Sequence, residues 1–470
     1  MPPSTTDTPT PIETGSPPGA RRVLWLSTVA FTLMFAVWLM LGMLSIPIKN
    51  ELGLTDGQFL QLTIAAMLAG SLLRFNFGVW TDKYGGRRVL TALLLLSVVP
   101  TLLVSQVTSF EQLLACALMY GVAGNSFTVG IAWNAAWFPR AKQGFALGVF
   151  GAGNVGASVT KLIGPFLIAA IPAAGYFGGV VPGGWRFIPV FYGVCLVGMA
   201  AAVWFLSPKA DRCPGRGRKF VEMVQPLKKF RVWEYCLHYV VVFGAYVAFS
   251  GMLPMYFYKN YAVELAPMIG LSPELSAEVG TLVKLSGDEY KNALAAIPGA
   301  KADMTYLTKV IGFVVAFLYV FPASLLRPLG GYLSDTYGPR PVMTSVFVAM
   351  LISGTLLTLP LALSVVPFTA LLFVLGAGMG IGKASVYKLI PDQFPNDVGA
   401  VGGLVGMLGA LGGTLIPLGV APLQAATGMP SVLFGVLLAL TALSTATYAV
   451  MELSERKAKV PAEVAEAQLV

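Results

Sequence analysis

The residues with the clearest chemical potential are four basic side chains inside apolar stretches: Arg74, Lys161, Arg327 and Lys383. We expect these stretches to be membrane-spanning helices, and their interiors contain no Asp or Glu. A basic side chain at mid-bilayer costs roughly 2.5–3.5 kcal/mol, so four of them without acidic partners would cost on the order of 10 kcal/mol. Because the sequence supplies no internal counter-ion, we expect a hydrated cavity and an anion from solution to balance these charges.

The two arginines occupy equivalent places in an internal repeat. The stretch from Leu72 to Val89, which contains Arg74, returns 253 positions later around Arg327, and nine of its eighteen positions are identical. In each copy the Arg lies four residues before a Gly-x-x-x-Asp sequence that leads into a basic turn. One unit used twice in the same orientation predicts two homologous halves related by an axis along the membrane normal.

The composition is typical of a membrane protein. Of the 470 residues, 56% are hydrophobic and 11% are charged, whereas ordinary globular proteins carry about 25% charged residues. About twenty apolar residues span a bilayer as a helix. We expect twelve such spans, at about 23–45, 59–80, 89–107, 111–137, 145–170, 187–207, 232–257, 309–333, 342–362, 368–391, 398–421 and 431–452. The predicted fold class is an all-α membrane protein with twelve transmembrane helices in two pseudo-symmetric six-helix halves.

The segments around these spans define the regions of the chain. We expect a disordered cytoplasmic tail at 1–22, an N-terminal half at 23–207, a basic cytoplasmic linker at 208–231, a C-terminal half at 232–452 and a cytoplasmic tail at 453–470. The external loop 258–308 contains two sequences that resemble helix starts, which predicts one or two short surface helices. Lys and Arg gather in the linker, the tails and one set of turns, so the positive-inside bias places both termini in the cytoplasm.

Other classes of function fit the sequence poorly. The net charge of +9 reflects orientation in the membrane rather than binding to nucleic acid. The four Cys have no paired spacing, so we expect neither a disulfide framework nor a metal site. No nucleophile–base pair appears in the predicted spans, so we expect no catalysis and no cofactor. A receptor would need a signalling domain, for which neither tail is large enough, and we expect a monomer.

A second set of candidates accompanies the basic residues. Asn154 lies in an apolar, Gly-rich span, and its amide could donate to an anion oxygen. Glycine every three or four residues in the fifth and eleventh predicted spans permits close helix packing, which is also a sufficient structural reason for most of these glycines. Several aromatic residues could line a narrow cavity: Phe31, Phe35, Trp38, Phe127, Trp133, Tyr239 and Phe243.

Charged residues at the predicted cytoplasmic helix ends indicate a gate. Asp82, Arg87 and Arg88 follow the first arginine, and Asp335 and Arg340 follow the second. A salt-bridge cluster between helices at this point would latch one conformation and release in the other.

Each basic residue also has a purely structural explanation. Arg74 and Arg327 lie about six residues from a helix end, roughly 9 Å by helical rise, so they could extend to the surface. Lys383 could be bonded to backbone carbonyls, and the position of Lys161 nearer the outer end of its span leaves its role open. His238, the single histidine, lies near the start of the seventh span, where we expect it to be interfacial rather than a proton relay.

These motifs resemble the major facilitator superfamily, and more narrowly its nitrate/nitrite porters. The sequence Gly-x-x-x-Asp-x-x-Gly-x-Arg-Arg is the superfamily's loop motif, and the second copy departs from it at Pro339 and Pro341. The narrower resemblance rests on the paired arginines, the stretches Gly121–Phe127 and Gly151–Gly156, and the Gly-rich eleventh span. The resemblance covers all twelve predicted spans.

The resemblance implies a secondary transporter of the cell inner membrane that carries nitrate, with or without nitrite, by rocking its two halves. In that family the anion lies between two arginines, which correspond to Arg74 and Arg327. The remaining candidates for its binding site are Asn154 with the preceding Gly153, Tyr239, Phe243, Phe35, Phe127 and Lys383. The paired donors of a guanidinium group match the oxygen spacing of a planar trigonal anion.

Lys161 and Lys383 resemble the nitrate/proton symporters of the family rather than its exchangers. Arginine does not deprotonate in proteins, whereas a desolvated lysine can. We therefore expect Lys383, or failing that Lys161, to release its proton when the anion leaves. A nitrate/nitrite exchanger and an organic-anion or phosphate porter of the same superfamily are the alternatives.

Overall fold

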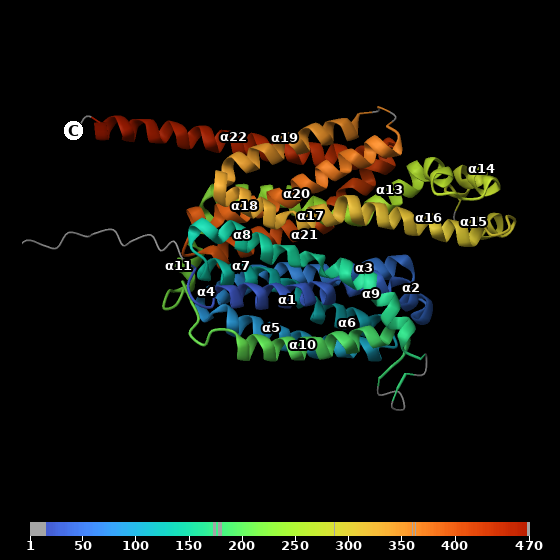
Figure 1. The fold of residues 1–470 in the computed structure, drawn as a ribbon, viewed down its shortest axis with the longest axis horizontal. Coiled ribbons are helices and arrows are strands. Elements are labelled where there is room, and N and C mark those ends of the chain that lie inside the picture. The colour runs from blue at the N-terminus through green and yellow to red at the C-terminus, as the bar shows by residue number, and fades with distance from the viewer. Residues whose placement is uncertain are drawn as a thin grey trace, which may run out of the picture.

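The structure, a computed structural model, describes residues 16–172, 175–176, 181–285, 287–359, 361 and 363–467. Long helices dominate it (Figure 1), because in a bilayer the backbone polar groups of a span must be satisfied within the helix. Before the linker lie α1 (Ala20–Trp38), α2 (Met40–Leu52), α3 (Asp56–Leu72), α4 (Arg74–Tyr84), α5 (Gly86–Leu103), α6 (Phe110–Tyr120), α7 (Ser126–Trp137), α8 (Arg140–Gly151), α9 (Gly156–Ala170) and α10 (Phe187–Leu206). After it lie α12 (Phe230–Tyr239), α13 (Ala245–Met268), α16 (Ala300–Val315), α17 (Phe321–Leu325), α18 (Arg327–Tyr337), α19 (Pro339–Thr358), α20 (Val365–Gln393), α21 (Val398–Thr427) and α22 (Val432–Ala467).

These helices provide the expected membrane spans. Among the described residues, eleven helical runs are long and apolar enough to cross a membrane. A further helical run, through α8, the 3₁₀ turn η3 (Ala152–Val155) and α9, corresponds to the predicted span 145–170. The all-α membrane fold class predicted from the sequence is therefore confirmed.

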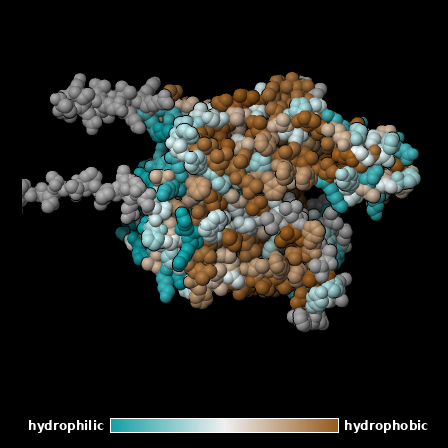
Figure 2. Space-filling view, in the orientation of Figure 1, coloured by the Kyte–Doolittle hydropathy of each residue, from teal (hydrophilic) through white to brown (hydrophobic). Residues whose placement is uncertain are grey.

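The spans form two bundles. Figure 1 shows α1–α10 in one bundle and α12–α22 in the other, with the described ends of the chain and the linker helix α11 (Phe220–Val224) at one end of the molecule. We call this the linker end, and the opposite end the loop end. Figure 2 shows a hydrophobic surface over the middle of the molecule, with hydrophilic residues gathered at its two ends. This distribution is the one expected when lipid surrounds the middle.

Helices also occupy the predicted external loop. The seventh and eighth spans extend past their predicted ends, because α13 continues to Met268 and α16 begins at Ala300. Between them lie α14 (Pro273–Leu282) and α15 (Gly287–Ala295). Ser272 caps α14 by accepting a hydrogen bond from the backbone N–H of Leu275 at 3.3 Å. The expectation of one or two short helices in this loop is confirmed, and there are two.

The linker is folded against both bundles. Asp211 accepts hydrogen bonds from the indole N–H groups of Trp133 at 2.9 Å and Trp137 at 3.0 Å, both in α7. Arg218 forms an ion pair with Asp397 at 2.7 Å, directly before α21. The linker therefore joins the two bundles at the linker end. Trp133, expected as a cavity-lining residue, packs at this end instead.

The two predicted tails differ in the structure. Most of the tail predicted at 1–22 lies outside the described residues, and α1 begins at Ala20. At the other terminus α22 continues to Ala467, so helix extends into the region predicted as the tail 453–470.

Candidate functional site

Most candidate site residues lie at interruptions of the helices. A single non-helical residue precedes each arginine, so that α4 begins at Arg74 and α18 begins at Arg327. Other candidates lie in or beside irregular turns: Asn154 in η3, Phe243 in the π-helical turn η7 (Val240–Gly244), and Phe127 just after the 3₁₀ turn η2 (Gly121–Asn125). At membrane depth, irregular backbone is tolerated where it is buried in protein or lines a cavity, and π turns are frequent at functional sites.

Arg74 and Arg327 are buried at the interface of the two bundles, with 0% and 1% of their surface exposed. Arg74 donates from Nη1 to the carbonyl of Gly406 in α21 at 3.0 Å. Arg327 donates from Nη1 to the carbonyl of Gly151 in α8 at 3.0 Å, and from Nη2 to the hydroxyl of Tyr239 at 3.2 Å. Each arginine thus contacts the backbone of the opposite bundle. Neither side chain extends to the surface.

Phe127 brings the two guanidinium groups together. The Cζ atoms of Arg74 and Arg327 lie 5.4 and 5.3 Å from the centre of its ring. Both guanidinium groups therefore lie within the range of cation–π attraction to this one ring. The two Cζ atoms can be no farther apart than about twice that distance. The Phe127 ring lies nearly parallel to those of Tyr239 and Phe243, with interplanar angles of 13° and 4°.

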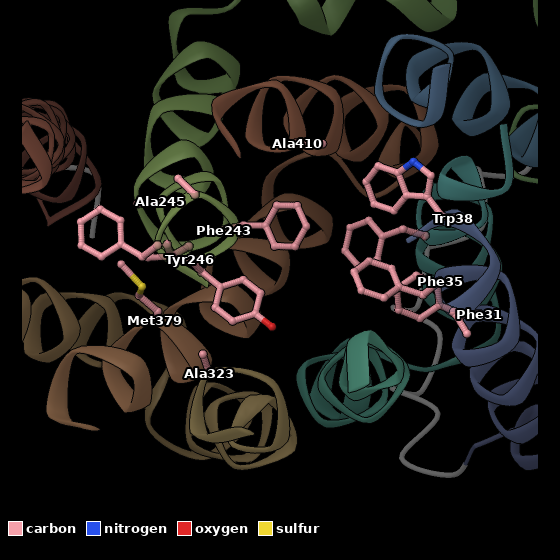
Figure 3. Packing of buried hydrophobic residues seen from close by; sticks show 14 of the residues in the cluster. Phe31, Phe35, Trp38, Phe243, Ala245, Tyr246, Ala323, Met379 and Ala410 are labelled. Carbon is pink, nitrogen blue, oxygen red and sulfur yellow. The ribbon is translucent and has the colours of Figure 1, made fainter. Parts of the chain in front are cut away.

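Aromatic residues of both bundles surround this arrangement. Figure 3 shows Phe243, from the C-terminal bundle, directed toward Phe31, Phe35 and Trp38 of α1. The ring of Trp38 lies 5.3 Å from Cζ of Arg74. The ring centre of Phe35 lies 5.5 Å from those of Phe31 and Trp38, which places Phe35 in the same aromatic group.

Three of the four basic residues lack an acidic partner in the part of the chain that the structure describes. Among the described side chains, no Asp or Glu forms an ion pair with Arg74, Arg327 or Lys383. Nη2 of Arg74, Nε of Arg327 and both amide atoms of the buried Asn154 also lack a hydrogen-bond partner. Each unsatisfied buried polar group costs about 1–3 kcal/mol. The site therefore presents buried donors and positive charge with no acceptor to match them.

Lys383 is buried beside the aromatic group. Its Nζ donates to the carbonyl of Ala323 at 3.0 Å and lies 3.1 Å from the ring centre of Tyr246. The same Nζ is 5.6 Å from the ring centre of Phe243. The backbone contact and the proximity to the candidate site therefore occur together. Lys161 lies in α9, but its side chain is outside the described residues.

Two further residues define the packing of the site. Tyr387 was not identified from the sequence, yet its ring meets those of Tyr239 and Phe127 edge-on at 4.8 and 5.2 Å. Its position four residues after Lys383 on one helix is the signal that could have identified it. Gly153 serves close packing, because a Cβ atom there would lie 2.6 Å from the ring of Phe31.

The two aspartates of the predicted gate join the bundles at the linker end. The Asp82 carboxylate accepts a hydrogen bond from the backbone N–H of Gly399 at 2.9 Å. The Asp335 carboxylate accepts from the N–H groups of Gly144 at 2.9 Å and Phe145 at 2.7 Å. Asp82 therefore binds the first turn of α21, where backbone donors are unsatisfied. Asp335 binds the second turn of α8.

The arginines of the predicted gate do not bridge the bundles. Arg87 donates to the backbone carbonyl of Trp204, and Arg340 forms an ion pair with Glu452 at 3.1 Å, each within its own bundle. Arg88 is exposed and has no ion pair among the described residues. Asp335 also forms an ion pair with Lys388 of α20 at 3.1 Å, within its own bundle. Between the bundles, the two aspartates contact backbone N–H groups rather than the arginines of the predicted gate.

His238 and Glu234 correct two expectations. His238 was expected at the membrane interface, but it is 0% exposed. Glu234, in the same helix α12, is 2% exposed, although the spans were expected to contain no buried carboxylate. The cause is tertiary packing, since α19 and α22 cover this part of α12.

Comparison with known proteins agrees with this fold. The family model of the Major Facilitator Superfamily matches residues 26–284 and 285–470. The solved structure of FucP, a transporter of that superfamily in the outward conformation, has a TM-score of 0.61 and covers 90% of this chain and 98% of its own, at 14% identity. The arrangement of helices is thus that of a membrane transporter, and the expectation that the chain is not an enzyme is confirmed.

Curated relatives narrow the assignment. The probable nitrate/nitrite antiporter NarK1 of Thermus thermophilus is 49% identical over 444 residues, which cover 91% of this chain and 90% of the relative. The probable nitrate/nitrite transporter NarK2 of Mycobacterium tuberculosis is 30% identical over 415 residues, covering 85% of this chain and 88% of the relative. The chain therefore belongs to the nitrate/nitrite porter family of the major facilitator superfamily.

Proposed function

We propose that this chain is a secondary transporter that carries nitrate, with or without nitrite, between Arg74 and Arg327. The observation that carries the proposal is that two buried arginines, which share one aromatic ring, have no acidic partner among the described residues. An anion from solution would supply the missing negative charge and accept from the unpaired donors of these arginines and of Asn154. Such charge-assisted hydrogen bonds are roughly twice as strong as neutral ones.

The surrounding rings support a small planar anion as the cargo. Phe127, Tyr239 and Phe243 stand nearly parallel, so the aromatic group beside the arginines presents flat faces. Flat walls suit a trigonal anion better than a tetrahedral one, and sulfate or phosphate would also need more donors than remain unpaired. The relatives named as nitrate/nitrite transporters support the same choice.

Transport would proceed by rocking of the two bundles about this site. The linker end would face the cytoplasm, because its turns and linker carry most of the Lys and Arg. We propose that a single chain in the cell inner membrane is sufficient, since both arginines and the aromatic group come from one chain.

Proton symport is the coupling we propose, with Lys383 as the group that changes charge beside the anion. Its Nζ lies against the aromatic group and has no acidic partner among the described residues. Exchange of nitrate for nitrite is the alternative, and the name of the Thermus thermophilus relative, a probable antiporter, favours it.

Uptake of labelled nitrate into proteoliposomes tests the assignment. Arg74→Lys and Arg327→Lys keep the charge but remove the paired donors, so we expect each variant to lose most of the uptake. Arg88→Lys is the matched control, because Arg88 is exposed and unpaired among the described residues, and it should transport as the parent does. Undiminished uptake in both site variants would refute the assignment. If phosphate or organic anions, but not nitrite, inhibited the uptake of labelled nitrate, an organic-anion or phosphate porter would be favoured.

A further inference from the structure

A buried pair of titratable side chains lies outside the candidate anion site. Glu234 and His238 are one helical turn apart in α12, and Nε2 of His238 lies 3.3 Å from Oε1 of Glu234. Neither of these two atoms has another hydrogen-bond partner. The other ring nitrogen, Nδ1, is 2.6 Å from the hydroxyl of Ser444 in α22. The imidazole is therefore held in place on one side and faces a carboxylate oxygen on the other.

The groups around the pair leave one negative charge in excess. Glu234 also accepts from Arg231 at 2.7 Å, and Arg231 donates to Glu455 at 3.1 Å. Arg340 of α19 pairs with Glu452 at 3.1 Å and with Glu455. Among the described side chains, this cluster thus sets three carboxylates against two guanidinium groups while the imidazole is neutral.

The other neighbours of His238 do not remove that excess. The rings of Phe347 in α19 and Tyr448 in α22 lie 5.2 and 5.6 Å from the imidazole, and both are neutral at ordinary pH. On α12 itself the remaining titratable neighbours are Tyr235 and Cys236, which are buried. From α20, Gln393 reaches Glu455 at 3.5 Å, and it carries no charge.

We propose that the Glu234–His238 pair binds a proton from the linker end and that this proton is coupled to the anion at Arg327. Protonation places N–H on both ring nitrogens, so Nε2 donates to Oε1 of Glu234 and the unpaired contact becomes a charge-assisted hydrogen bond. The same step adds a positive charge beside Glu234, which is buried, whereas Arg340 and Glu455 of the same cluster are partly exposed. The coupling, but not the proton site itself, rests on the function proposed above.

The chain itself provides the connection between the two sites. Tyr239 follows His238 directly, and its hydroxyl accepts the hydrogen bond from Arg327 at 3.2 Å. The next residues form the π turn η7, which carries Phe243 against Phe127. A shift of α12 against α22 on protonation therefore moves the residue that holds Arg327. Linkage requires the reverse effect, in which anion binding favours protonation.

The single histidine makes the proton site directly observable. In full-length protein without a histidine tag, labelled at histidine, NMR should detect one imidazole that gains a proton as the pH is lowered. Nitrate should raise the midpoint, and Arg327→Lys should abolish this response. Glu234→Gln should lower the midpoint, since it removes the carboxylate charge. An imidazole that stays neutral as the pH is lowered in folded protein, or whose midpoint is the same with and without nitrate in protein that binds nitrate, would overturn the proposal.

Transport measurements separate this inference from the function on which it rests. In His238→Gln and Glu234→Gln, nitrate counterflow should persist while accumulation driven by a pH gradient is lost. Thr441→Val is the matched control, because Thr441 is buried in α22 but bonds only to its own helix. Parent protein without counterflow would refute nitrate transport, and the histidine titration would still decide proton binding. Counterflow with intact pH-driven accumulation in both folded variants would refute the coupling.

Discussion

The Asp82 carboxylate accepts a hydrogen bond from the backbone amide of Gly399, across the interface between the two bundles, at 2.9 Å. The same relationship recurs between Asp335 and Gly144, also at 2.9 Å. Both carboxylates belong to the repeated loop motif, and both meet a helix near its N-terminus. Closure at the linker end is thus built twice, once from each half of the sequence.

Removing the charge of these aspartates should weaken closure. A hydrogen bond to a charged group contributes about 1.5–3 kcal/mol, and Asp82→Asn or Asp335→Asn keeps the shape with a neutral acceptor. We expect the ratio of closed to open protein to fall by roughly tenfold, which corresponds to about 1.4 kcal/mol. Spin labels at the exposed positions of Tyr84 and Tyr337, in a cysteine-free background, would report the separation of the bundles. Distance distributions unchanged from those of the parent, as expected for an Arg88→Ala control, would contradict this role.

A methyl group at the glycine contact should prevent closure. A Cβ atom on Gly331 would lie 2.0 Å from the carbonyl oxygen of Gly144, and one on Gly78 would lie 1.9 Å from that of Gly399. We expect Gly331→Ala to hold the linker end open and to abolish transport, even though alanine favours a helix by up to about 1 kcal/mol. Gly198→Ala, where the added atom meets no neighbour, should transport normally. The idea fails if the Gly331 variant transports at the parent rate.

A carboxylate introduced at Asn154 should replace the substrate as counter-ion. Asn154 lies one helical turn after Gly151, whose carbonyl binds Arg327, and both of its amide atoms are unpaired. We expect Asn154→Asp to weaken nitrate binding by at least about tenfold, or about 1.4 kcal/mol. Asn154→Ser, which stays neutral, should be impaired less. Equilibrium binding of nitrate to the purified proteins measures both effects. If Asn154→Asp bound nitrate as tightly as the parent does, Asn154 would not lie near the bound anion.

Lys383→Arg should separate anion binding from proton coupling. Arginine stays charged in proteins, whereas a desolvated lysine can lose its proton. We expect the variant to retain nitrate counterflow and to lose accumulation driven by a pH gradient. The same vesicles with a nitrite gradient in place of the pH gradient provide the control. Unchanged pH-driven accumulation would remove Lys383 from the coupling mechanism.

Much of the candidate site could be predicted because charge inside a membrane span is conspicuous. Arg74, Arg327 and Lys383 stand out in apolar sequence, and the repeat assigned equivalent places to the two arginines. The aromatic residues were harder, because the spans contain many and only packing decides which of them face inward. Phe127 lies at the centre of the site, whereas Trp133, in the same helix, bonds to the linker through Asp211.

The gate and His238 show where sequence reasoning fails. The loop motif contains charges of both signs, which suggests ion pairs. Backbone N–H groups act as the partners instead, and a backbone donor has no signature in the sequence. The backbone partners of Asp82 and Asp335 in the opposite bundle therefore could not be identified before the two halves were placed together. His238 was misassigned because distance along α12 does not reveal that α19 and α22 cover it.

The glycine contacts described at the linker end have a consequence for how such a carrier can diversify. At Gly78 with Gly399, and at Gly144 with Gly331, main-chain atoms of the two bundles meet directly. Substitutions in the anion site can therefore change its selectivity without disturbing the contact between the bundles, provided that these four positions remain glycine.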